Sequence, residues 1–180
     1  MGSCPNLARP SQAPSSGSGL QRLVSSFLGR SCRLIYLPDK VTRYIERPFD
    51  DPKWRVSLAD GYPLLIATQA SLDLLNARLP SPTSMERFRP NLVISGTAPH
   101  AEETWRRIQI GSVQLAIVKA CARCSTVLVD PHTANLGSEP LKTLAKYRRM
   151  PASVMSAQNA LVLTSGELGL GSAVEIADAK

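Results

Sequence analysis

KACARCSTVLVDP, residues 119–131, is the most informative segment of this 180-residue chain. It places Cys121 and Cys124 with two residues between them, and Arg123 directly before the second cysteine. A cysteine thiolate is a soft ligand that suits heavy transition metals. The run at 125–129 is rich in β-branched residues and predicts a rigid strand that holds Cys124.

On chemistry alone, three roles compete for the two cysteines. A thioredoxin-like dithiol needs its Cys-x-x-Cys at the start of a helix, and the predicted strand disfavours that role. A structural zinc site needs four ligands, usually in two close pairs. The other candidate ligands are not spaced as a pair: Cys4, Cys32, His100 and His132. For a lone Cys-x-x-Cys the default interpretation is therefore two packed, reduced thiols.

The composition predicts a globular chain of ordinary size in a reducing, intracellular compartment. The chain is 43% hydrophobic, which allows one domain with a proper core, and no apolar run reaches the roughly 20 residues of a membrane helix. Four cysteines without two clear pairs favour reduced thiols. The net charge of +7 suits an anionic ligand or partner, or a solvated basic surface. No basic stripe with interleaved aromatic residues indicates nucleic-acid binding.

The N-terminus has an unusual charge pattern. Residues 1–38 contain no acidic side chain, and apolar residues fall at helical spacing from Leu20 to Leu28. One interpretation is an organelle transit peptide, and the location is left open between cytoplasmic and mitochondrial. The interpretation that we favour is a disordered tail at 1–18, followed by a single domain at 19–180 that includes the helix.

The predicted elements are mostly short strands. Three helices are expected. The first covers 19–29, and the third covers 140–149. The second follows Thr68, with Leu72, Leu75 and Leu79 on one apolar face. Gly111-Ser112 indicates a hairpin. Strands are expected at 32–37, 54–58, 64–67, 92–94, 108–110, 113–118, 161–163 and 174–176. Because no βαβ alternation is visible, the pattern predicts an α+β, mainly β fold that is β-barrel-like.

In order along the chain, these segments resemble the MOSC domain, the C-terminal domain of molybdenum cofactor sulfurase. The branch that includes the mitochondrial amidoxime-reducing component and its bacterial relatives is the more similar one. The resemblance covers roughly residues 19–177 and rests on DGYP at 60–63, SLDLLN at 71–76, RFRPN at 87–91, AEETW at 101–105, CARC at 121–124, VDP at 129–131, PLKTLAKYR at 140–148 and QN at 158–159.

The resemblance implies a molybdenum cofactor (molybdopterin) site and a role for each matching residue. Cys124 would be the catalytic residue and the protein ligand of the metal, with Cys121 only a packed thiol. Arg123 would keep the thiolate ionised and meet the negative charge of the cofactor. Arg89 and Asn91 would contact the pterin and its phosphate, as would Asn159 near the C-terminus. A second set would serve structure or turns rather than catalysis: Asp130, Glu102 and Trp105.

The implied activity is the reduction of N-hydroxylated substrates, such as amidoximes and hydroxylamines, by a molybdenum-dependent oxidoreductase. Its partners would be an electron-donor flavin or haem protein and the small substrate. An alternative from the sulfurase branch is a sulfur-carrier or cofactor-binding module that works with a pyridoxal-phosphate cysteine desulfurase. A further alternative is an inactive truncated member of the family.

The chain also departs from the family pattern. Relatives carry another β-rich domain before this one, so the resemblance implies a truncated chain whose cofactor pocket is open on one side, with weak binding and low activity. Ser156-Ala157 stands where relatives have Phe-Gly, and Gly171-Ser172 where they have Gly-Asp.

Overall fold

The computed structural model describes residues 18–45, 54–59 and 61–180, which form parts of two units, Met1–Thr42 and Arg43–Lys180. The expected disordered tail at 1–18 lies outside the described residues, except for its last residue. The boundaries that the sequence predicts for the domain, 19–180, remain a prediction.

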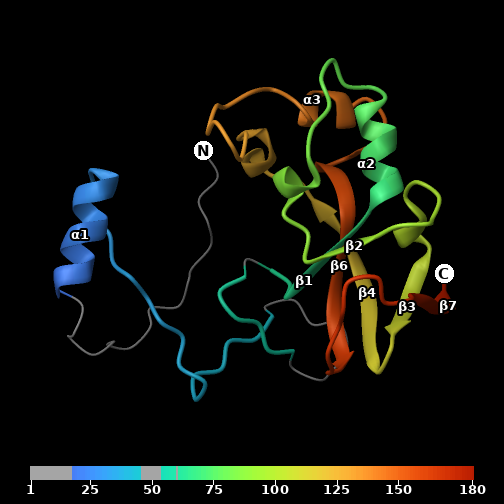
Figure 1. Ribbon diagram of the computed structural model, residues 1–180, viewed down its shortest axis with the longest axis horizontal. Helices are drawn as coiled ribbons and strands as arrows, with labels where there is room; N and C mark the ends of the chain where they lie inside the picture. The colour runs from blue at the N-terminus through green and yellow to red at the C-terminus, as the bar shows by residue number, and fades with distance from the viewer. Residues whose placement is uncertain (1–17, 46–53, 60) are drawn as a thin grey trace. The chain divides into compact units, whose positions relative to one another are not determined.

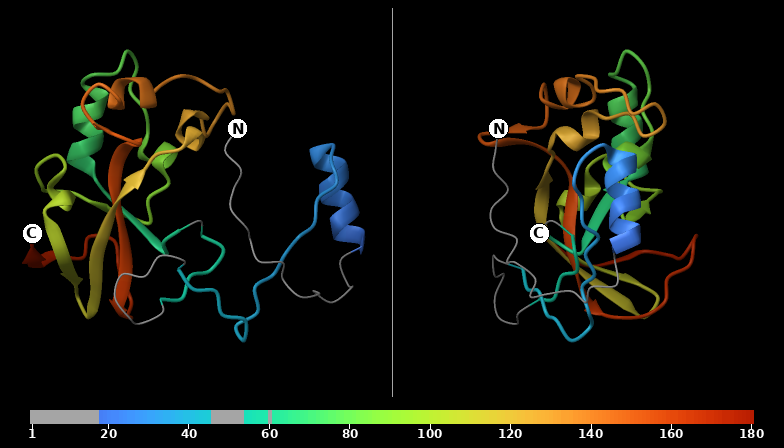
Figure 2. Two further views of the ribbon diagram at one scale, coloured as in Figure 1. Left: turned by 180° about the vertical axis from the view of Figure 1, so that it is seen from behind. Right: turned by 90° about the vertical axis from the view of Figure 1, so that its left-hand side faces the viewer.

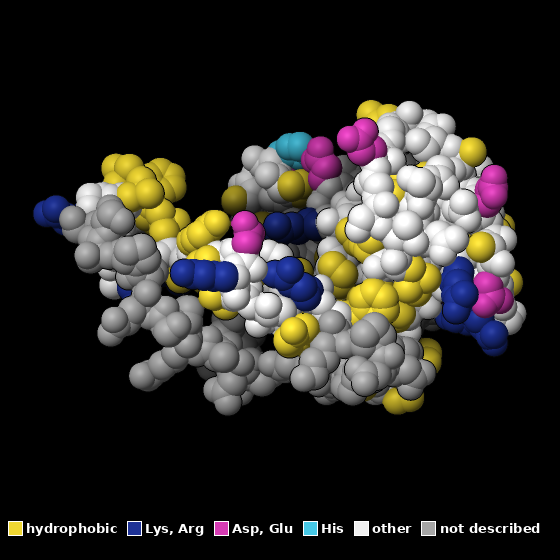
Figure 3. Space-filling view, turned by 90° about the horizontal axis from the view of Figure 1, so that it is seen from below, with side chains coloured by type: hydrophobic (Ala, Val, Ile, Leu, Met, Phe, Trp, Pro, Cys, Tyr) yellow, Lys and Arg dark blue, Asp and Glu magenta, His cyan; other side chains and the backbone are white. Residues whose placement is uncertain are grey.

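The described part of the first unit contains one helix, α1 (Ser18–Leu28), at the predicted position. The strand predicted at 32–37 is wrong: this segment has no regular structure, and Tyr36 is 73% exposed. A strand needs a hydrogen-bonded neighbour, and within the described residues no segment pairs with it. Figure 3 shows hydrophobic side chains on the surface of this unit, and its exposed apolar residues include Leu20, Leu23, Phe27, Leu34 and Ile35.

The second unit is a curled seven-stranded sheet that forms a half-barrel, with a few short helices (Figures 1 and 2). The α+β, mainly β, barrel-like fold predicted from the sequence is confirmed. The sheet order is β2-β1-β6-β4-β3-β7, with β5 paired to β6. The strands are β1 (Leu64–Thr68), β2 (Leu92–Ile94), β3 (Trp105–Ile110), β4 (Val113–Ala122), β5 (Arg149–Met150), β6 (Ser153–Thr164) and β7 (Glu175–Ala179).

One connection contradicts the sequence analysis. β1 and β2 pair in parallel, and the chain crosses between them through α2 (Gln69–Asn76) and η1 (Met85–Phe88). This is a βαβ unit, although none was visible in the sequence. The connection at 69–91 is long enough for a crossover helix, which parallel strands require. The strand predicted at 54–58 is also wrong, since only Arg55 forms an isolated bridge, with Tyr44.

The predicted hairpin between β3 and β4 is confirmed. Ile110 faces Val113 across the turn, and Gly111 has φ +57°, a left-handed conformation that glycine adopts without strain. Within the described residues, no helix is long and apolar enough to span a membrane.

Two hydrophobic clusters organise this unit. The first lies along the sheet and is built from buried residues of five strands, among them Ile66, Trp105, Ile108, Leu115 and Ala160. The second lies beside α2 and joins α2, η1, η3 (Ser125–Leu128) and α3 (Leu141–Leu144) through Leu72, Leu75, Phe88, Val127 and Leu144. Because η1 and η3 share this second cluster, the Arg-Pro-Asn turn and the cysteine loop are held in the same region of the molecule.

A β-bulge interrupts the long β4–β6 pair next to the cysteine motif. β4 advances two residues from Ala120 to Ala122, while β6 advances three residues from Met155 to Gln158. Ala157 takes up the extra residue with φ +67° and is buried. A left-handed residue at a bulge is usually glycine, the residue that the family resemblance places here.

We expect the strain at Ala157 to appear in a comparison with Ala160, another buried alanine of β6. Either change to glycine removes a methyl group worth about 0.8 kcal/mol of burial and adds roughly 0.5–1 kcal/mol of chain entropy cost. Only Ala157→Gly also relieves left-handed strain of about 1–2 kcal/mol. Urea unfolding should therefore show Ala160→Gly losing about 1–2 kcal/mol and Ala157→Gly close to the original chain. Equal losses in the two variants would contradict this account.

Candidate functional site

Cys124 lies at the start of a short 3-10 helix rather than on a strand. β4 ends at Ala122, and Cys124 is the N-terminal capping residue of η3. The strand predicted at 125–129 is therefore wrong. Local β-propensity is overridden there because Val127 turns inward and is 1% exposed in the second cluster.

The surroundings of Cys124 favour a thiolate. Its side chain is exposed, and Sγ lies 3.2 Å from the Thr126 hydroxyl oxygen. Hydrogen bonds from the hydroxyl and the backbone N–H of Thr126 lower the pKa of the Cys124 thiol, and the charge of Arg123 adds to this effect. Partial burial acts in the opposite direction. The contribution of Arg123 was expected from the sequence, whereas that of Thr126 was not.

Arg123 points toward η1. One terminal nitrogen, Nη2, donates to the Phe88 carbonyl oxygen at 2.7 Å, and Nη1 lies 3.2 Å from Cys121 Sγ. The guanidinium carbon is 5.7 Å from the centre of the Phe88 ring. Arg123 thus joins β4 to η1, and its contact with the cofactor remains a prediction.

Arg89 and Asn91 follow η1 directly. Arg89 ends η1 with φ +53° and is exposed, and its guanidinium makes no hydrogen bond or ion pair with other described residues. Asn91 is bonded twice to Leu65 of β1: its backbone N–H donates to the Leu65 oxygen, and its Oδ1 accepts from the Leu65 N–H, both at 2.8 Å. The side-chain amide of Asn91 therefore keeps its NH₂ group for another acceptor.

Asn159 is placed near Asn91 by the sheet. It lies on β6, directly opposite Leu65 of β1 and Lys119 of β4. The structure therefore brings both predicted asparagines next to the same residue, Leu65. Sequence reasoning could not find this arrangement, because it depends on the pairing of β1 between β2 and β6.

Asp130 forms the turn that the sequence predicts. Its Oδ1 accepts from the backbone N–H groups of His132 at 3.0 Å and Thr133 at 2.9 Å. These bonds, and the charge of Arg87, lower the pKa of the Asp130 carboxyl. Its Oδ2 forms an ion pair with Arg87 at 2.5 Å, a partner that the sequence analysis missed.

These residues suit an anionic group that brings its own metal ligands. Among the described residues, no three His, Cys, Asp or Glu side chains lie close enough to hold a metal ion. Cys124 offers one exposed soft ligand, and Arg89 an exposed cation. A metal bound at Cys124 would therefore need further ligands from outside this part of the chain.

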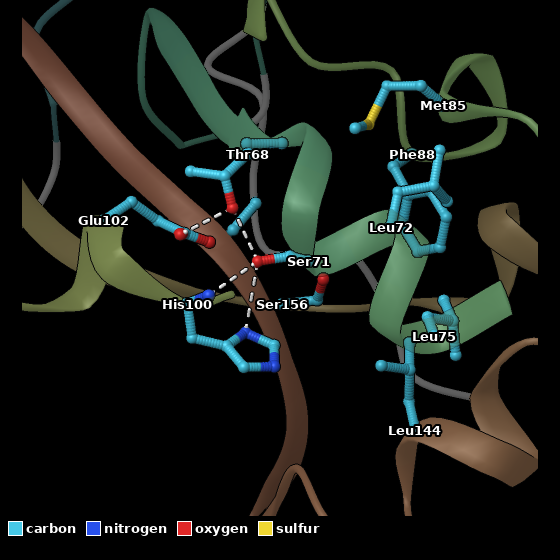
Figure 4. Close-up of a pocket in the computed structure, with 12 residues that line it drawn as sticks. Thr68, Ser71, Leu72, Leu75, Met85, Phe88, His100, Glu102, Leu144 and Ser156 are labelled. Carbon is cyan, nitrogen blue, oxygen red and sulfur yellow. Dashed lines mark hydrogen bonds between the residues drawn. The ribbon is translucent and has the colours of Figure 1, made fainter. Parts of the chain in front are cut away.

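A buried polar cluster lies at the N-terminal end of α2 and lines one side of a cavity of about 20 Å³ (Figure 4). Thr68 precedes α2, and its hydroxyl donates to Glu102 Oε2 at 3.0 Å rather than capping the helix. Ser71 lies 2.6 Å from the same hydroxyl and accepts from the His100 backbone N–H at 2.8 Å. Glu102 is fully buried, so burial raises the pKa of its carboxyl. Nothing in the sequence spacing indicated this cluster.

We expect Glu102 to make stability depend on pH. Because its pKa is higher in the folded than in the unfolded chain, the folded state binds more protons above about pH 4.5, and stability falls as pH rises toward the folded pKa. Glu102→Gln removes this titration. Thermal unfolding should therefore show Glu102→Gln gaining stability relative to the original chain between acid and neutral pH. Glu167 is exposed, so Glu167→Gln is the control, and its stability should follow that of the original chain at each pH. The prediction would be contradicted if the stability of both variants changed with pH in the same way.

Comparison with known proteins identifies the family. The MOSC domain model matches residues 53–175. Mitochondrial amidoxime-reducing component 1 of Mus musculus is 40% identical over 138 residues, covering 73% of this chain and 40% of that protein. The Homo sapiens protein of the same name is 44% identical over 103 residues, covering 57% of this chain and 31% of that protein. Molybdenum cofactor sulfurase of Oryza sativa subsp. japonica is 31% identical over 148 residues, covering 73% of this chain and 18% of that protein.

The chain thus spans 40% or less of the length of these relatives. The family match covers more than half of the chain, including β1, β4 and β6 and the cysteine loop between β4 and β6. The resemblance seen in the sequence is confirmed, and this chain belongs to the MOSC domain family.

Proposed function

We propose that this chain binds the molybdenum cofactor and forms part of an oxidoreductase that reduces N-hydroxylated substrates such as amidoximes and hydroxylamines. The family supports a function related to the molybdenum cofactor. The observation that carries the finer proposal is the exposed Cys124 thiol with its lowered pKa, in the same region as the Arg89 turn.

Each residue has a separate task in this proposal. Cys124 supplies one thiolate ligand, which Thr126 keeps ionised by donating hydrogen bonds to the sulfur. Arg89 provides the cation for the phosphate of the cofactor, and arginine suits this task because it can donate two parallel hydrogen bonds. Asn91 and Asn159 orient the pterin through their amide groups. When bound, the cofactor supplies the redox chemistry of N–O bond reduction.

The proposed partners are an electron-donor flavin or haem protein and a small N-hydroxylated substrate. The mitochondrial names of several relatives suggest a mitochondrial location for this chain, with a cytoplasmic one as the alternative. Both locations agree with reduced thiols, and the described cysteines Cys32, Cys121 and Cys124 are free.

A second candidate function is a sulfur carrier or cofactor-binding module that works with a pyridoxal-phosphate cysteine desulfurase. It is favoured by the 31% identity to the rice molybdenum cofactor sulfurase over 73% of this chain. Incubation with such a desulfurase and free cysteine would then add one sulfur atom to a cysteine of this chain, as mass spectrometry can detect. If the mass of the chain did not change, the sulfur-carrier function would be rejected. The remaining candidates would be a reductase and an inactive member of the family.

We expect Cys124→Ser to abolish molybdenum retention after loading with the cofactor, while Cys121→Ser keeps most of it. The reason is that the Cys124 thiol is exposed, whereas Cys121 Sγ is partly covered and contacts Arg123. Elemental analysis of the gel-filtered protein gives the metal content of each variant. Equal loss in both variants would mean that the two cysteines share the metal or form only a structural pair.

The activity has its own test. With an artificial electron donor, the loaded chain should reduce a simple amidoxime, and Cys124→Ser should lower the rate to background. Thermal unfolding of the variant shows whether it is still folded. Reduction that persists in Cys124→Ser would remove this cysteine from the reaction.

A further inference from the structure

The two arginines of the Arg87-Phe88-Arg89 segment have different surroundings. The Arg87 side chain is only 14% exposed, whereas Arg89 is exposed and has no partner among the described residues. Phe88 between them is buried in the second hydrophobic cluster. Only Arg89 is therefore available to an external anion, and Arg87 serves the protein itself.

Arg87 links three segments that are distant in the sequence. From η1, its Nη2 pairs with Asp130 Oδ2 at 2.5 Å, beyond the end of η3. Its Nη1 donates to the carbonyl oxygen of Glu139 at 3.5 Å. The carboxylate of Glu139 in turn accepts from the backbone N–H of Thr143 in α3 at 2.9 Å.

Asp130 uses its two oxygens for different purposes. Oδ1 accepts from the backbone of residues 132 and 133 and so fixes the turn after η3, while Oδ2 faces Arg87. η1 is also joined to the segment before η3, because Arg123 donates to the Phe88 carbonyl oxygen at 2.7 Å. η1 and η3 have four residues each, and such short 3-10 helices need outside contacts to hold a fixed position.

We propose that Arg87 and Asp130 are positioning residues that fix the turn carrying Arg89 relative to the loop carrying Cys124. This inference rests on the proposed function of Arg89 and Cys124. Neither Arg87 nor Asp130 contacts the cofactor in this proposal. Their ion pair sets the separation between the cation and the thiolate, and a binding site requires such separations to be held within about 0.5 Å.

The chain offers a matched control for the test. Arg148 and Glu103 form a second ion pair whose side chains are 18% and 32% exposed, against 14% and 31% for Arg87 and Asp130. Asp130→Asn keeps an oxygen for the turn bonds and replaces the carboxylate oxygen that faces Arg87 with an uncharged NH₂ group, which cannot accept from the guanidinium. Glu103→Gln removes the negative charge of the control pair.

The first measurement is molybdenum content after loading, at equal fractions of folded protein. Asp130→Asn should lower retention at least tenfold relative to Glu103→Gln. Arg87→Lys, which keeps the charge but loses the fork that reaches both Asp130 and Glu139, should lie between them and covers the case in which Asp130→Asn folds poorly.

The second measurement needs no cofactor. Spin labels are attached to Cys124 and to Arg89→Cys in a chain whose other cysteines are changed to serine, and the distribution of label distances is recorded. Asp130→Asn should broaden this distribution, while Glu103→Gln should leave it unchanged. If the original chain retains no molybdenum, the proposed function fails and the label distances alone decide the positioning role. Equal behaviour of the two variants in the label measurement would overturn the inference.

Discussion

The antiparallel pair of β4 and β6 is the interaction on which the other parts of the second unit depend. β6 has 12 residues and β4 has 10, and every other strand except β2 and β7 pairs directly with one of them. β1 pairs with β6 on one side and with β2 on the other. β3 pairs with β4 on one side and with β7 on the other. β4 runs toward the cysteine loop and ends two residues before Cys124, whereas the antiparallel β6 begins near this end of β4.

The bulge in this pair connects the sheet to the site. An extra residue in one strand bends it and increases its twist. Here the extra residue lies at Ala157, opposite the last residues of β4, so the bend falls where the chain leaves the sheet to form the cysteine motif. Directly after the bulge, the Arg123 N–H donates to the Val154 oxygen at 2.9 Å and continues the pairing of the two strands up to the site. The sheet thus determines the direction in which Arg123 and Cys124 are presented.

The sequence predicted those features that depend on local pattern. The apolar runs of β1, β2 and β4, the Gly111 turn and the helix with Leu72 and Leu75 are all confirmed. It failed where tertiary contacts override propensity. The run at 125–129 has strand character but forms a 3-10 helix because Val127 packs against Phe88 and Leu144 in the second cluster. Leu34 and Ile35 have strand character too, but have no partner strand within the described residues.

The half-barrel leaves two strands, β2 and β7, at the open edges of the sheet. Such edges invite pairing with a second molecule and can start aggregation. β2 has only three residues, and β7 is exposed along its whole length and carries Glu175 and Asp178, with Lys180 directly after it. A short strand offers few free hydrogen-bonding groups, and charged side chains oppose the approach of another strand. The short β2 and the charged β7 therefore oppose edge-to-edge pairing, a protection that a closed barrel would obtain by having no edges.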